Sequence, residues 1–229
     1  KKILVVAPLL TRSGYGEHAR LIVDALSERP DLFDLHVESI PWGATPWITD
    51  FGHKRKYYDF LVKKRMSYAG EYDLSLQVTI PTEFKKYAHL NIGVTAGIES
   101  DRVSPSWIQH ANHMDLMLVT SKHAQSGFMR NDVKAKLPNG QLMDIRYTVD
   151  TKVINYPVKY ADAEDLSEKI ALENDYNFLT VAQWGPRKNL SNLIKWFVEE
   201  FHNENVGLVV KTNRAKNCLT DRMVCTDLL

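Results

Sequence analysis

The sequence has no apolar run near the ~18 residues that a transmembrane helix needs, so it predicts no membrane span. Cysteine is scarce: Cys218 and Cys225 alone exclude a disulfide framework and are typical of buried or half-buried thiols in a reducing compartment. The sequence also has no large excess of positive or negative charge, because it contains 29 basic and 28 acidic residues. We therefore expect a cytoplasmic protein with no nucleic-acid partner.

What is present is an alternation of short apolar runs and amphipathic stretches, which is typical of an α/β fold with a mainly parallel sheet. Residues 131–148 are polar, and we expect them to be irregular. The predicted strands are 3–7, 35–40, 74–80, 90–95, 116–120, 153–158, 178–182 and 206–211, and the predicted helices are 17–28, 53–70, 105–115, 122–130 and 190–202.

This order of elements predicts a Rossmann-like N-terminal domain, a connecting segment and the first part of a second Rossmann-like domain. We place them at residues 1–158, 159–176 and 177–229. The last part has only two predicted strands, and two strands cannot bury both faces of a sheet. Together with the absence of an initiator methionine, this leads us to expect a fragment of a longer protein.

A glycine motif follows the first predicted strand. Gly14-Tyr-Gly16-Glu-His-Ala19 matches G-x-G-x-x-G/A, and Glu38 near the end of the second strand resembles the ribose-binding acid of a dinucleotide fold. However, six residues separate Ala7 from Gly14, whereas that fingerprint needs a tight turn directly after the strand. Two interpretations stay open: glycines required by loop geometry, or a loop whose N–H groups contact a ligand phosphate or an acceptor.

Two adjacent cations, Arg187 and Lys188, lie between the strand predicted at 178–182 and the helix predicted at 190–202. Cations beside the positive N-terminus of a helix destabilise it unless an anion lies between them. The pair therefore predicts a diphosphate site, and the alternative is a solvated pair on the surface.

Carboxylates follow the strand predicted at 90–95. Glu99 and Asp101 come at the carboxyl edge of the sheet, where open α/β folds bind ligands. Such a carboxylate either orients a sugar hydroxyl or caps the next helix, and both interpretations stay open. His110 and His113 are three residues apart on one predicted helix, but without a clear third ligand they predict no metal site.

A basic stretch interleaved with aromatic residues covers Lys54-Arg-Lys56 and Lys63-Lys-Arg65. It fits peripheral contact with an anionic membrane, such as the inner membrane surface, or contact with an acidic acceptor. A solvated helix face is the third interpretation.

With these parts placed, the chain resembles the retaining GT-B glycosyltransferases of family 4, and its middle segment resembles those of bacteria and their phages. Three segments carry the resemblance. Residues 3–26 form the opening strand, glycine loop and helix. Residues 97–121 are similar to the family's E…P..W…N..D…S stretch, and residues 178–201 are similar to the strand, basic loop and RKN helix that open its C-terminal domain.

The resemblance implies a hexosyltransferase in polysaccharide biosynthesis, with two Rossmann-like domains. The nucleoside-diphosphate sugar is then a substrate, no metal or other cofactor is expected, and a glycan, lipid or protein accepts the sugar with retention of configuration. Lys188 would contact the donor diphosphate. The family's partner arginine stands five residues before Lys188, where this chain has Gln183, so Arg187 would supply that charge. Lys211, which ends the next strand, is a further diphosphate candidate.

For the other side of the reaction, the resemblance implies that Gly14 and Gly16 approach the donor phosphate and the acceptor. We expect His18 and Glu99 to orient the acceptor. The family's paired-Glu motif is absent and would lie beyond residue 229, so we expect no turnover from this chain alone. Two other classes stay open: a dinucleotide-dependent oxidoreductase or sugar epimerase, and a non-catalytic sugar-binding module.

Overall fold

The computed structural model describes residues 1–49, 53–130, 133–136, 138–158 and 171–228. The chain divides into two compact units, Lys1–Gly43 with Trp47–Val158 and Ala44–Pro46 with Lys159–Leu229. The connecting segment predicted at 159–176 lies outside the described residues as far as residue 170.

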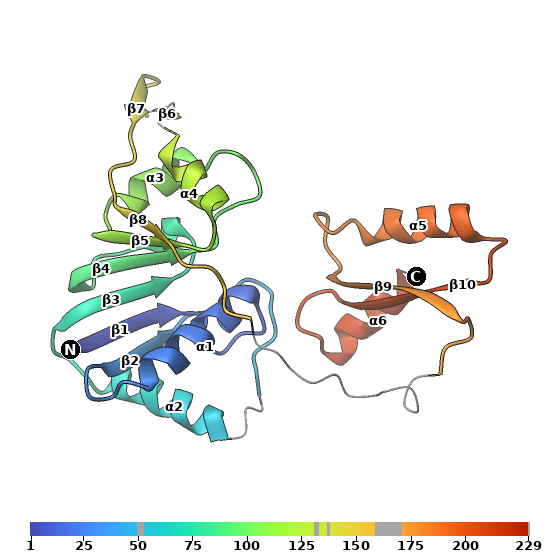
Figure 1. Ribbon diagram of the computed structural model, residues 1–229, viewed down its shortest axis with the longest axis horizontal. Coiled ribbons are helices and arrows are strands. Elements are labelled where there is room, and N and C mark those ends of the chain that lie inside the picture. The colour runs from blue at the N-terminus through green and yellow to red at the C-terminus, as the bar shows by residue number, and fades with distance from the viewer. Residues whose placement is uncertain (50–52, 131–132, 137, 159–170, 229) are drawn as a thin grey trace. The chain divides into compact units, whose positions relative to one another are not determined.

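The first unit is built on a six-stranded parallel sheet of order β2-β1-β3-β4-β5-β8 (Figure 1). This confirms the α/β, Rossmann-like class. The strands are β1 (Lys2–Ala7), β2 (Asp34–Ser39), β3 (Tyr72–Val78), β4 (Ala88–Thr95), β5 (Leu116–Val119) and β8 (Thr151–Val153). The helices are α1 (Gly14–Ser27), α2 (His53–Met66), α3 (Pro105–Ala111) and α4 (Lys122–Met129), with a 3₁₀ turn at Pro81–Glu83.

Strand β1 is apolar on both sides because both faces of the sheet are covered there. Its Ile3 and Val5 share a buried cluster with Val23 of α1 and Tyr58 of α2. Its Leu4 points the other way and packs in a second cluster of buried side chains. The continuous apolar run read from the sequence thus corresponds to a central strand.

Helices α3 and α4 pack against the other end of the sheet. Met117 of β5 is buried with Ile108 of α3 and Phe128 of α4, whereas the alternate residue Leu118 packs with the α1 cluster. The strand predicted at 153–158 is shorter and earlier, since β8 ends at Val153.

The prediction that residues 131–148 are irregular was wrong, because they contain an antiparallel hairpin of β6 (Val133–Lys136) and β7 (Leu142–Ile145). Asn139-Gly140 lies in the connection, with Gly140 at φ +86°. Asn-Gly between two short runs is a strong hairpin signal, because tight hairpin turns need positive φ.

The second unit is a parallel β-α-β unit followed by one more helix. It comprises β9 (Tyr176–Gln183), α5 (Leu190–Phe201), β10 (Val206–Asn213) and α6 (Leu219–Asp227). Figure 1 shows α5 on one face of the strand pair and α6 on the other. Phe178 packs on α5, with ring centroids 5.7 Å from Phe197 and 5.2 Å from Phe201.

Two strands leave apolar surface uncovered in this unit: Leu179 and Val181 of β9 are 67% and 64% exposed. Cys225 is buried, but Cys218 is exposed, so the prediction of a buried or half-buried thiol was wrong for Cys218. Within the described part of the chain, no helix has both the length and the apolar character that a membrane crossing requires.

Candidate functional site

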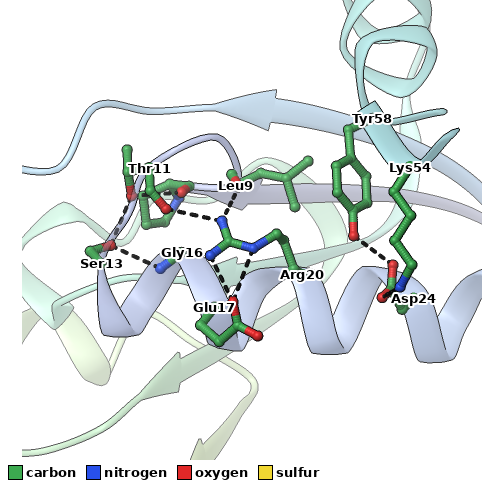
Figure 2. Close-up of polar contacts among 10 residues, drawn as sticks. Leu9, Thr11, Ser13, Gly16, Glu17, Arg20, Asp24, Lys54 and Tyr58 are labelled. Atoms are coloured by element: carbon green, nitrogen blue, oxygen red, sulfur yellow. Dashed lines mark hydrogen bonds and ion pairs between the residues drawn. The ribbon is translucent and has the colours of Figure 1, made fainter. Parts of the chain in front are cut away.

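The loop after β1 is fixed by one buried guanidinium (Figure 2). Arg20 Nη1 donates to the carbonyl oxygens of Leu9 at 2.7 Å and Thr11 at 2.9 Å. Its Nε and Nη2 donate to Glu17 Oε2 at 3.2 and 2.8 Å. Because Arg20 is only 8% exposed, its bonds to the two carbonyl oxygens are shielded from water, and they hold the loop in one conformation. The Glu17 side chain is 56% exposed.

The glycines of this loop have different surroundings. The N–H of Gly16 donates to Ser13 Oγ at 3.0 Å, so Ser13 caps α1 and occupies that amide. A Cβ on Gly16 would lie 2.3 Å from the carbonyl oxygen of Thr11, whereas a Cβ on Gly14 would meet nothing within 4 Å. Loop geometry therefore explains Gly16. The predicted phosphate contacts of Gly14 and Gly16 stay a prediction.

The first turn of α1 is tied to the end of β4. Tyr15 Oη lies 2.8 Å from Thr95 Oγ1 and accepts from the N–H of Ala96 at 3.1 Å. Burial raises the pKa of Tyr15, which keeps the phenol neutral. Trp42 packs on its ring at 4.3 Å between centroids. The carboxyl edge of β1 and β4 is thus one rigid frame, at the edge where such sheets bind ligands.

The two residues predicted to orient an acceptor lie in different environments. His18 is 6% exposed and packs edge-on against Tyr156, with ring centroids 4.6 Å apart. Its Nδ1 has no hydrogen-bond partner among the described residues, and burial lowers its pKa. Glu99 is exposed in the loop after β4. Only His18 is therefore shielded from water, and both roles stay predictions.

We expect the free energy of unfolding to fall as the pH drops below about 6.5, and to fall less steeply in His18→Phe. Since the pKa of His18 is lowered in the folded state, the unfolded chain takes up this proton first. The stability that depends on neutral His18 is complete above that pH and is lost below it. Urea denaturation of both proteins at several pH values measures this, and an identical pH dependence would contradict it.

The polar residues in the stretch 97–121 hold the fold together. Asn112 donates to the carbonyl oxygen of Arg146 at 2.8 Å, and Asp115 accepts from the N–H of Asn91 at 2.7 Å. Ser121 caps α4. Structural roles thus explain three polar positions that carried the resemblance.

The acid required by the dinucleotide alternative is already engaged, because Glu38 Oε2 lies 3.2 Å from Arg65 Nη2. Other cations of the basic stretch on α2 are also paired: Lys54 with Asp24, Arg55 with Asp59 and Lys64 with Asp34. Tyr58 donates to the same Asp24 at 2.7 Å (Figure 2). These ion pairs favour the interpretation that the basic face of α2 stabilises the first unit through contacts within it.

In the second unit, α5 begins without a side-chain cap. Its N-cap residue, Asn189, is left-handed with φ +51°, and its Oδ1 accepts from the side chain of Asn192 at 2.9 Å instead of from a backbone amide. The first hydrogen bond of the helix runs from the N–H of Leu193 to the carbonyl oxygen of Asn189, at 3.1 Å. The amides before it therefore have no acceptor in the helix, which is the arrangement that binds anions.

A cavity of about 340 Å³ lies at this helix N-terminus, beside the carboxyl ends of β9 and β10. Its lining includes Asn189 and Ser191 from the start of α5 and Arg214, which directly follows β10. Backbone N–H donors, that of Ala215 first, lower the pKa of Asp221, and the nearby charge of Arg214 adds to this effect. Among the described residues the Arg214 guanidinium makes no hydrogen bond or ion pair. The start of α5 and a cation thus lie around one cavity, whose other walls include Trp184, Pro186 and Leu228.

Of the cations predicted to bind diphosphate, Arg187 and Lys188 are exposed in the loop before α5, outside the residues that line this cavity. Val210 of β10 pairs with Thr180 of β9, whose side chain is on the face of the strand pair that α5 covers. Side chains alternate along a strand, so Lys211 lies on the face opposite to α5. Its diphosphate role stays a prediction. Arg214 was missed, although it follows β10 directly and Lys211 was named for its place at the end of the same strand.

No family model matches the chain, and a search of curated proteins found no match either. No group of three or more His, Cys, Asp and Glu side chains is placed to hold a metal ion in the described part of the chain.

Proposed function

We propose that this chain binds the diphosphate of a nucleoside-diphosphate sugar at the N-terminus of α5, as part of a glycosyltransferase. The observation that carries this is the uncapped start of α5, which lies with Arg214 around one cavity at the carboxyl edge of a parallel β-α-β unit. The retaining transfer and the glycan, lipid or protein acceptor rest on the resemblance of three sequence segments to family 4 glycosyltransferases.

The proposed chemistry is electrostatic. When the sugar leaves, the diphosphate gains negative charge, and donors already aimed at that position stabilise it without reorganising. Helix amides and Arg214 would supply these donors, and Arg187 and Lys188 would add positive potential from the adjoining loop. Losing one such donor typically costs about 2–4 kcal/mol of transition-state stabilisation.

We expect UDP or GDP to bind the chain saturably, and Arg214→Ala to weaken that binding about tenfold or more, because it removes a charge-assisted contact. Lys188→Ala should weaken it less, because it removes only positive potential from the adjoining loop. Isothermal titration calorimetry measures the affinities. Lys195→Ala is the matched control: Lys195 is exposed on α5 beside Glu199, and its loss should change the affinity less than twofold. Uridine and guanosine, which lack phosphate, should bind far more weakly.

Two results would reject the diphosphate site. One is the absence of saturable binding by either nucleotide. The other is equal affinity of the wild type, Arg214→Ala and Lys188→Ala. If Lys211→Ala weakened binding as much as Arg214→Ala, the site would lie on the other face of the strand pair.

A further inference from the structure

The cation of the proposed diphosphate site lies on a short loop. Residues 214–218 connect β10 to α6, and α6 lies on the face of the strand pair opposite to α5 (Figure 1). Arg214, the first residue of this loop, lines the cavity at the start of α5. Because no described residue bonds to its guanidinium, the backbone of the loop sets where this cation lies.

Asp221 of α6 holds that backbone with its carboxylate. Its Oδ2 accepts from the N–H groups of Arg214 at 3.1 Å, Ala215 at 3.0 Å and Asn217 at 3.0 Å. Its Oδ1 accepts from the N–H of Ala215 at 2.9 Å. Asp221 is only 9% exposed, and hydrogen bonds to an ionised carboxylate are about twice as strong as neutral ones. The loop is therefore wrapped around one buried charge.

Gln183 holds the same loop from the end of β9. Its Nε2 donates to the carbonyl oxygen of Arg214 at 2.7 Å, and the N–H of Trp184 donates to the carbonyl oxygen of Asn213, also at 2.7 Å. The backbone N–H of Arg214 is thus bonded to α6 and its carbonyl oxygen to β9. The resemblance to family 4 places an arginine at position 183, and in this chain the glutamine there holds a different arginine.

We propose that Asp221 and Gln183 are positioning residues that aim Arg214 at the diphosphate, an inference that rests on the proposed function. Neither side chain lines the cavity, so both act through the loop. A loop already fixed in place loses little conformational freedom when Arg214 meets the anion, which strengthens binding.

The charge of Asp221 by itself would have the opposite effect on binding. A negative charge beside an anion site repels the anion, so its removal alone would strengthen diphosphate binding. Loss of positioning weakens that binding instead. The sign of the change in affinity therefore separates the two roles of Asp221.

Isothermal titration calorimetry, with whichever of UDP and GDP binds the wild type, tests the proposal. We expect Asp221→Asn, which keeps the shape of the side chain, and Gln183→Leu, which changes no charge, each to weaken binding about threefold or more. In the Arg214→Ala background the same substitutions should change the affinity less than about 1.5-fold, because no guanidinium is left to position. A general loosening of the second unit would weaken binding equally in both backgrounds.

Asp227→Asn is the matched control for Asp221→Asn. It removes the same charge from an exposed residue at the end of α6, outside the loop, and should not weaken binding. Near-ultraviolet circular dichroism checks the fold of each variant. Because Asp221 and Gln183 lie on different elements, one variant tests the loop if the other does not fold.

The positioning role and the diphosphate site are rejected by different results. Either residue loses the role if its folded variant binds as tightly as the wild type, or weakens binding equally with and without Arg214. The diphosphate site then stands. If Arg214→Ala binds as tightly as the wild type, or if the wild type binds neither nucleotide, the site is rejected and the positioning role with it.

Discussion

Replacement of Arg20 by methionine should lower the free energy of unfolding of the first unit by about 3 kcal/mol. The substitution keeps an unbranched side chain but removes the donors that reach the carbonyl oxygens of Leu9 and Thr11 and the carboxylate of Glu17. Hydrogen bonds to charged groups contribute about 1.5–3 kcal/mol each, and both carbonyls would lose a buried partner. Urea denaturation, with hydrogen exchange of the β1 amides as the local readout, measures the loss.

Arg29→Met is the matched control for Arg20→Met. Arg29 also makes paired bonds to a carboxylate, at 3.0 and 2.8 Å to Asp31, but these two side chains are 56% and 60% exposed. Exposed ion pairs are screened by water and contribute little, so we expect a much smaller loss than in Arg20→Met. If Arg20→Met and Arg29→Met lost the same free energy of unfolding, the burial of Arg20 would not explain how much Arg20 stabilises the fold.

The sequence predicts the sheet of the first unit well because most of its strands are short runs of apolar residues that can be recognised locally. The run Ile3-Leu-Val-Val-Ala7 is apolar at every position, as a strand covered on both faces requires. The hairpin of β6 and β7 was missed because Val133-Lys-Ala-Lys136 is short and half charged. The Asn139-Gly140 turn was its readable signal.

The candidate sites were predicted less completely because they depend on contacts between distant residues. Pattern matching finds the motif of Gly14 and Gly16, but not that Ser13 already occupies the amide of Gly16. Arg20 looks like any polar residue of an amphipathic helix, and only the folded loop shows it buried against two carbonyls. Likewise, the uncapped start of α5 follows from the left-handed backbone of Asn189, which residue identity does not specify.

Gly16→Ala should destabilise the first unit by about 3 kcal/mol, whereas Gly14→Ala should be close to neutral. The added methyl at position 16 would lie 2.3 Å from the carbonyl oxygen of Thr11, which is backbone and is held by Arg20, so it cannot move aside freely. At position 14 the methyl meets nothing within 4 Å, and alanine has the better helix propensity. Urea denaturation of both variants measures the contrast.

The same carbonyl links the two variants expected to be most destabilising. Thr11 O accepts from Arg20 and lies against Gly16, so Arg20→Met should free the loop to make room for the methyl of Gly16→Ala. Residues that share a partner are not additive, and the double variant should lose at least about 0.5 kcal/mol less than the sum of the single losses. If the losses in free energy of unfolding were strictly additive, Arg20 would not hold the loop against Gly16. If Gly16→Ala were as stable as the wild type, the loop would be able to move away from the added methyl group.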